Sequence, residues 1–246
     1  MGEVRLAMLV SGGGTTMEAI LQCWAQCQLP GIAPVAVIAS KEDIGAIEKA
    51  RAYDFERGAI TVISPRGKSQ EQFGQEILTH FESFGVTHFG QYGWMPLTPP
   101  AVVKAFAGCS INQHPGPLDP GRPDFGGKGM YGIRVHAAVL HFLRMLDPID
   151  PRRDSPCTEV TAQRVACDFD EGGVLGWRCV QILEGDTPEQ LQQRALPLEH
   201  RLQIETLIRL GEGRLTTIER TDGPYVFPEE DAILATAKNL AIEDYP

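Results

Sequence analysis

An α/β architecture, with a doubly wound and mostly parallel sheet in a single domain, is the fold that this sequence favours. Short apolar runs typical of buried strands alternate from the start with segments of helical periodicity. The connections between them are short and rich in glycine and proline. The length of 246 residues and a hydrophobic content of 43% are ample for a substantial core.

The first half of the chain supplies four strand–helix pairs. "VRLAMLV" at Val4–Val10 is nearly continuous in apolar residues, as expected for a strand buried on both faces. The helix after it places Met17, Ile20 and Leu21 at helical spacing, and a later helix repeats the pattern with Phe73, Ile77 and Phe81. The predicted strands cover residues 4–10, 34–40, 59–64 and 86–92, and the predicted helices residues 15–27, 44–53, 69–84 and 98–106.

The second half begins with a strand over 108–112 and a Gly- and Pro-rich loop over 119–131. A helix over 133–146, a turn-rich connection over 147–157 and two strands over 159–167 and 174–183 follow. A long helix over 186–210 has clear start signals, because Thr187 and Gln190 have capping-box spacing around Pro188. From Gly211 onward the chain is polar and partly strand-like. We therefore expect one domain over residues 1–214 and a C-terminal tail over 215–246 that packs on it or extends it.

Composition excludes several kinds of protein. A net charge of −10 and a pI near 5.1 disfavour a nucleic-acid groove, which needs clustered Lys and Arg. No apolar run approaches the roughly 18 residues of a membrane span. The six cysteines form no C-x-x-C pair and the six histidines no H-E-x-x-H motif, so we predict no metal site and a reduced, cytoplasmic setting.

The segment "SGGGTT" at 11–16 joins the first strand to the first helix. Glycines allow a ligand to approach the backbone, and free N–H groups at a helix start favour an anion. A dinucleotide fingerprint would need a third glycine at Met17, and a Walker A motif would need a lysine. A phosphorylated small molecule is the functional interpretation, and a plain glycine turn is the structural alternative.

Two further patterns carry possible chemistry. Asn112 and His114 lie two apart at a strand end, so their side chains project to the same side, and prolines follow them. An amide N–H can stabilise an oxyanion and an imidazole can move a proton near neutral pH. "CDFDEGGV" at 167–174 offers carboxylates, one of which would raise the pKa of His114 if it lay close. Alone, each pattern is also compatible with a polar strand end or a solvated acidic turn.

Taken together and in order, these segments resemble the folate-dependent formyltransferase family, which has a Rossmann-like fold. The resemblance rests on the first strand with "SGGGTT", "GWMPL" at 93–97, the "N-x-H-P" core at 112–115, "FDEG" at 169–172 and "LEH" at 198–200. It implies a cytoplasmic transferase that uses 10-formyltetrahydrofolate as co-substrate. It also implies a phosphorylated small-molecule amine as acceptor, without nucleic acid, membrane or metal, in a monomer or homodimer.

The resemblance assigns a role to individual residues. Asn112, His114 and Asp170 would be catalytic, Asp170 being chosen over Asp168 and Glu171 because it precedes "x-Gly" as the family's aspartate does. Protonated His114 and Asn112 would stabilise a tetrahedral oxyanion, while Asp170 would keep His114 charged and assist proton transfer. The implied ligand-binding residues are Gly14, Thr15 and Thr16 for the phosphate, Glu199 for the ribose, and Trp94, Met95, Pro96, Leu97, Thr98, Cys167 and Asp168 for the folate.

The acceptor is the point on which the residues leave alternatives open. The motifs most resemble the branch of the family that formylates glycinamide ribonucleotide in purine biosynthesis. The loop after His114 differs from the family's usual Ser-Leu-Leu-Pro and is longer, so another phosphorylated or nucleotide-linked amine, such as an amino sugar, is a second interpretation. A formyltetrahydrofolate hydrolase is disfavoured, because such hydrolases usually carry an additional N-terminal regulatory domain, whereas Val4 already begins the first strand of the catalytic domain. A non-catalytic folate- or phosphate-binding module is disfavoured by the intact catalytic trio.

Overall fold

The computed structural model describes residues 3–119, 122, 124–220 and 224–246. Its contacts divide the chain into two compact units. The first comprises residues 1–113, 164–167 and 203–216, and the second comprises residues 114–163, 168–202 and 217–246. The boundary between Gln113 and His114 falls within the last strand of the parallel series. Each unit is described by itself.

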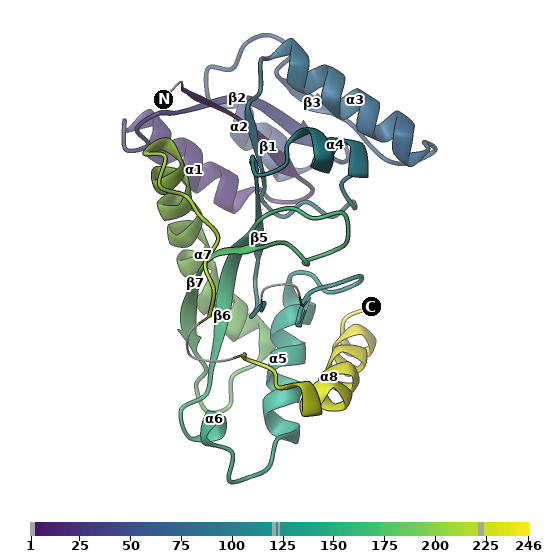
Figure 1. The fold of residues 1–246 in the computed structure, drawn as a ribbon, viewed down its shortest axis with the longest axis vertical. Coiled ribbons are helices and arrows are strands. Elements are labelled where there is room, and N and C mark those ends of the chain that lie inside the picture. The colour runs from purple at the N-terminus through teal and green to yellow at the C-terminus, as the bar shows by residue number, and fades with distance from the viewer. Residues whose placement is uncertain (1–2, 120–121, 123, 221–223) are drawn as a thin grey trace. The chain divides into compact units, whose positions relative to one another are not determined.

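The first unit is built on parallel strands. These are β1 (Val4–Val10), β2 (Ile32–Ala39), β3 (Ile60–Val62), β4 (His88–Gln91) and β5 (Ser110–His114), in the order β3-β2-β1-β4-β5 (Figure 1). The order reverses direction between β1 and β4. In doubly wound sheets the carboxyl ends of the strands at such a switch point are where ligands bind.

Helices cover both faces of this sheet. They are α1 (Thr15–Ala25), α2 (Gly45–Arg51), α3 (Gln70–Ser83) and α4 (Pro100–Ala105), with α1 contacting α2 and α3 contacting α4. Ala7 and Leu9 of β1 belong to the core cluster that includes Phe73 and Phe81 of α3. The intervening residues of β1, such as Met8, are also fully buried and point to the opposite face, where α1 and α2 lie. The predicted doubly wound α/β fold is thus confirmed.

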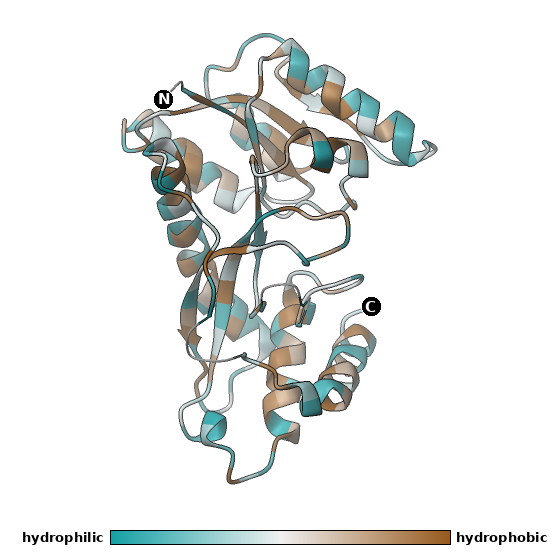
Figure 2. Cartoon of the chain, in the orientation of Figure 1, coloured by the Kyte–Doolittle hydropathy of each residue, from teal (hydrophilic) through white to brown (hydrophobic). Residues whose placement is uncertain are grey.

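Helix α3 shows how closely the local sequence specifies its element. Ser69 accepts a hydrogen bond from the backbone N–H of Gln72, and the Gln72 side chain accepts one from the backbone N–H of Ser69, so a capping box begins the helix. Phe73, Ile77 and Phe81 are buried as their spacing predicts. Figure 2 shows the hydrophilic and hydrophobic residues that alternate along this amphipathic helix.

The second unit combines an antiparallel strand pair with helices. It holds β6 (Cys157–Gln163) paired with β7 (Val174–Gln181), together with α5 (Ile133–Met145), α6 (Pro151–Asp154), the 3-10 turn η1 (Pro228–Glu230) and α8 (Asp231–Asp244). Helix α7 (Pro188–Gly211) belongs to this unit up to Leu202, and its Thr187–Gln190 capping box is present. Helices α5 and α8 pack side by side (Figure 1).

The predictions for the second half were wrong at three places. The short helix α6, capped by Asp150, forms within the connection over 147–157, which was expected to be rich in turns and for which no helix was predicted. β6 ends at Gln163 instead of 167, because Arg164 and Val165 bond to Ser110 of β5 instead of continuing the β6–β7 ladder. The chain beyond residue 230 is helical, not partly strand-like: four alanines favour α8, and Leu234, Ala237 and Ala241 form its buried stripe.

Candidate active site

The glycine loop after β1 has the geometry of an anion-binding helix start. Gly14 is the residue before α1 and has φ of 66°, a conformation that favours glycine. A Cβ on Gly14 would lie 2.6 Å from Ala46 Cβ, whereas a Cβ on Gly12 or Gly13 would meet nothing within 4 Å. The loop backbone is therefore packed on one side and open on the other. Thr15 is exposed and Thr16 is buried.

The segment after β4 lies against this loop. Ser11 Oγ accepts hydrogen bonds from Ser40 Oγ at 2.7 Å and from the Met95 backbone N–H at 2.9 Å, and the Ser11 N–H donates to Gly93 O at 3.1 Å. The structure thus brings together the ends of β1 and β4, as the switch point requires. Both ends belong to the first unit.

The predicted folate segment has an inner and an outer part. Trp94 is 8% exposed and stacks on Phe73, and Thr98 is buried where it accepts a hydrogen bond from Gln91. Met95 is 42% exposed, and Pro96 and Leu97 are partly exposed. Trp94 and Thr98 therefore hold the segment in place, and Met95, Pro96 and Leu97 are the side chains left accessible to a ligand.

His114 ends β5 and opens the second unit. Its side chain is only 3% exposed, and Nδ1 lies 3.7 Å from Asp170 Oδ1. Nε2 is buried and has no hydrogen-bond partner among the described residues. A buried polar atom without a partner is costly, so Nε2 is the atom of this ring that is available to a substrate.

Asp170 is held by contacts on two sides. Oδ1 accepts a hydrogen bond from Gln163 Nε2 at 2.7 Å, and Oδ2 accepts one from the backbone N–H of Gly127 at 2.9 Å. The residue has φ of 59°, which Asp tolerates better than most residues. A carboxylate fixed in this way can orient the imidazole of His114.

Burial dominates the protonation of His114. Desolvation lowers the pKa of His114 below its usual value, whereas Asp170 acts in the opposite direction and raises it. The sequence predicted the effect of the carboxylate on this pKa but not the burial that outweighs it. Without a further negative charge nearby, the neutral imidazole is favoured.

Three contributors to this centre were missed from the sequence. Gln163 at the end of β6 and the Gly126–Gly127 turn touch Asp170 directly. Lys238 of α8 interacts electrostatically with both Asp170 and His114. The glycine pair was visible as a turn signal, but nothing in a single sequence ties a C-terminal lysine to His114.

The other predicted site residues lie as follows. Asn112 is partly exposed on β5 and belongs to the first unit. Glu199 is 5% exposed on α7 in the second unit. Cys167 and Asp168 are exposed. The carboxylate that the structure sets beside His114 is Asp170.

Two further features of the described residues concern metal binding and membrane spanning. In that part of the chain, no group of three or more His, Cys, Asp or Glu side chains is placed to hold a metal ion. Among the same residues, no helix combines the length and apolar character needed to cross a bilayer.

Comparison with known proteins agrees with this geometry. The sequence profile of the family described as "Formyl transferase" matches residues 4–207, which is most of the chain. The chain therefore belongs to the formyl transferase family. The residues of the glycine loop, the 93–98 segment, His114 and Asp170 all fall within the matched range.

Particular relatives narrow the comparison. The chain is 32% identical over 214 residues to the chloroplastic phosphoribosylglycinamide formyltransferase of Arabidopsis thaliana. The alignment covers 86% of this chain and 66% of the relative. It is 23% identical over 231 residues to the phosphoribosylglycinamide formyltransferase of Escherichia coli strain K12, covering 92% and 97%. The chain spans slightly less than two thirds of the length of the plant relatives.

A solved structure gives the same picture at the level of the fold. The crystal structure of glycinamide ribonucleotide transformylase 1 from Symbiobacterium toebii superposes with a TM-score of 0.73 at 26% identity. The alignment covers 89% of this chain and 92% of that protein.

Proposed function

We propose that this protein transfers the formyl group of 10-formyltetrahydrofolate to the amine of glycinamide ribonucleotide, a step of purine biosynthesis. The observation that carries the proposal is the buried His114, with Asp170 near Nδ1 and with an Nε2 that has no hydrogen-bond partner in the described part of the chain. Membership of the formyl transferase family and the names of the relatives support this chemistry.

The proposed mechanism uses one proton and one oxyanion. The substrate amine attacks the formyl carbon, and its carbonyl oxygen becomes negatively charged. Neutral His114 accepts the proton of the attacking amine at Nε2. The resulting imidazolium lies next to Asp170, which stabilises it, and later gives the proton to the folate nitrogen that leaves. The products are the formylated amine and tetrahydrofolate.

Burial of His114 makes this stabilisation selective for the reacting state. The low pKa of His114 disfavours the imidazolium until a second negative charge, the oxyanion, forms nearby. We assign the side-chain amide of Asn112, two residues earlier on β5, to donate a hydrogen bond to that oxyanion. Loss of one such donor typically lowers kcat by about 10²–10³.

Substrate binding is assigned to the strand ends at the switch point and to α7. The N–H groups of Gly14, Thr15 and Thr16 at the start of α1 would hold the substrate phosphate. Glu199 would accept hydrogen bonds from the ribose hydroxyls. The folate would contact Met95 and its neighbours in the 94–98 segment together with the 167–168 turn.

Acceptor dependence tests the proposal. Purified protein is mixed with 10-formyl-5,8-dideazafolate, and deformylation is followed by absorbance with glycinamide ribonucleotide, with an amino-sugar nucleotide, and with no acceptor. The proposal predicts turnover only with glycinamide ribonucleotide. Turnover without acceptor would identify a hydrolase, and turnover only with the amino-sugar nucleotide would identify another acceptor. Folate binding without turnover in any mixture would leave a binding protein, and each of these results contradicts the proposal.

A further inference from the structure

The C-terminal helix α8 sends one cation toward the candidate active site. Lys238 Nζ donates hydrogen bonds to the backbone carbonyls of Asp124 at 2.8 Å and Gly126 at 2.7 Å. Its side chain is partly buried, and this desolvation lowers its pKa below the usual lysine value. Desolvation of the ammonium group costs free energy, and the hydrogen bonds to the two carbonyls offset part of that cost.

The turn that Lys238 holds is in direct contact with Asp170. A Cβ on Gly126 would lie 2.5 Å from Asp170 Cβ, so the two residues pack as closely as a glycine allows. The next residue, Gly127, donates its N–H to Asp170 Oδ2. Asp170 in turn faces His114 Nδ1. The contacts therefore run without interruption from α8 to the imidazole.

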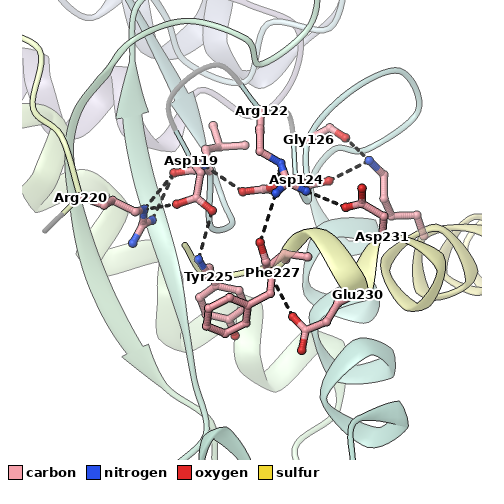
Figure 3. Close-up of polar contacts among 12 residues, drawn as sticks. Asp119, Arg122, Asp124, Gly126, Arg220, Tyr225, Phe227, Glu230 and Asp231 are labelled. Carbon is pink, nitrogen blue, oxygen red and sulfur yellow. Dashed lines mark hydrogen bonds and ion pairs between the residues drawn. The ribbon is translucent and has the colours of Figure 1, made fainter. Parts of the chain in front are cut away.

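Further contacts join the C-terminal segment, including the start of α8, to the loop that contains Asp119, Arg122 and Asp124 (Figure 3). Arg122 donates to Asp231 Oδ1 at 2.6 Å and to Val226 O at 3.3 Å. On the other side of the loop, Asp119 accepts from the Tyr225 N–H at 3.1 Å and pairs with Arg220 at 2.6 Å. Helix α8, which carries Lys238, is therefore tied to the loop by Asp231, and the Lys238 ammonium group bonds to the same loop at Asp124 and Gly126.

We propose that Lys238 is a positioning residue for Asp170. Lys238 holds the 124–127 turn, and in that turn the Gly127 N–H and the Gly126 backbone fix the Asp170 carboxylate. This inference rests on the proposed function for its catalytic consequence. It assigns a role to a helix that lies beyond residue 207, the end of the range matched by the family profile. Because Lys238 Nζ bonds to two backbone carbonyls of the turn that holds Asp170, its loss should lower the rate of the reaction more than it weakens substrate binding.

A double-mutant cycle tests whether Lys238 acts through Asp170. Lys238→Met should lower kcat by about 10- to 100-fold, the usual effect of displacing a catalytic group by an ångström, with KM for both substrates changed by less than about threefold. In an Asp170→Asn background the same substitution should cost less than about threefold, because the two act in one chain of contacts. Equal losses in both backgrounds would overturn the proposal.

Two further variants separate positioning from stability. Asn239→Met, at the neighbouring exposed position of α8, should leave kcat and the melting temperature unchanged. If Lys238→Met does not fold, Lys238→Gln, which keeps one donor, takes its place in the cycle. A loss of kcat in the Asn239 variant equal to that at Lys238 would make the effect one of helix stability and overturn the proposal.

Amide hydrogen exchange gives a readout independent of activity. Loss of Lys238 should speed exchange of the Gly127 amide by at least about tenfold, since its bond to Asp170 is released, while the core amides of α5 are unchanged. An unchanged Gly127 rate would overturn the proposal. If the wild-type protein shows no formyl transfer at all, the proposed function fails, and the exchange measurement alone decides the role of Lys238.

Discussion

Gly126→Ala should disable the site by moving one carboxylate. The added Cβ would lie 2.5 Å from Asp170 Cβ, 2.7 Å from Cγ and 2.6 Å from Oδ2. Carbon atoms pack at about 3.5–4.0 Å, so the two residues must separate by about 1 Å. Gly126 is not among the glycines with positive φ, so alanine brings no backbone strain of its own. A shift of that size would change the 3.7 Å separation between Asp170 Oδ1 and His114 Nδ1, on which their electrostatic interaction depends.

The expected result is a fall in kcat of about 100-fold, with KM little changed. Overpacking should also lower the free energy of unfolding by about 1–3 kcal/mol. Formyl transfer to glycinamide ribonucleotide, followed by absorbance, measures the first effect and urea denaturation the second. Gly129→Ala is the matched control, because it strains the same loop at φ of 87° but meets no atom of Asp170. A Gly126→Ala enzyme within about threefold of wild-type kcat would refute the positioning of Asp170 by this turn.

Two other predictions concern the glycine loop at 11–16 and the buried carboxyl group of Asp124. Gly14→Ala should raise KM for the phosphorylated amine by at least about tenfold, with a smaller change in KM for the folate. The added Cβ would lie 2.6 Å from Ala46 Cβ and 2.8 Å from Ala46 Cα, so it would displace the start of α1. Equal changes in the two KM values in steady-state kinetics would contradict this prediction. Burial and the neighbouring Asp119 raise the pKa of Asp124 to about 8, so the folded state binds this proton more tightly than the unfolded state. Its stabilisation is full below about pH 4 and is lost as the pH rises toward 8, by about 1.4 kcal/mol per unit of pKa difference. Asp124→Asn should therefore flatten the fall in stability that urea titrations show between pH 5 and pH 8, and an unchanged slope would argue against a protonated Asp124.

Local signals in the sequence predicted the elements well. The Ser69–Gln72 and Thr187–Gln190 capping boxes begin α3 and α7 where expected, because the same residues that mark the sequence make the cap bonds. The nearly continuous apolar run of β1 indicated a strand covered on both faces. The tail was misjudged because its polar residues hid an alanine-rich helix with a narrow buried stripe.

The centre itself depended on long-range contacts that no local pattern contains. The motif order pointed to Asp170, and the structure sets Asp170, not Asp168, beside His114. Lys238 could not be foreseen, since Asp124 and Gly126 lie far from it in the sequence, and no local pattern tied Gln163 to Asp170 across the turn between β6 and β7. The burial of His114 was also unforeseen, because Asn112-Gln113-His114 reads as a polar strand end, and that burial reverses the direction in which the pKa was expected to move.

The central claim is that His114 carries the proton of a formyl-transfer reaction. Its most direct test is the kcat of His114→Ala for formyl transfer to glycinamide ribonucleotide, measured beside the folate Kd from fluorescence titration. We predict a fall in kcat of at least about 10³-fold with the folate Kd within about threefold of wild type. Glycinamide-ribonucleotide-dependent turnover within about tenfold of the wild-type rate would show that another group moves the proton and would contradict the account.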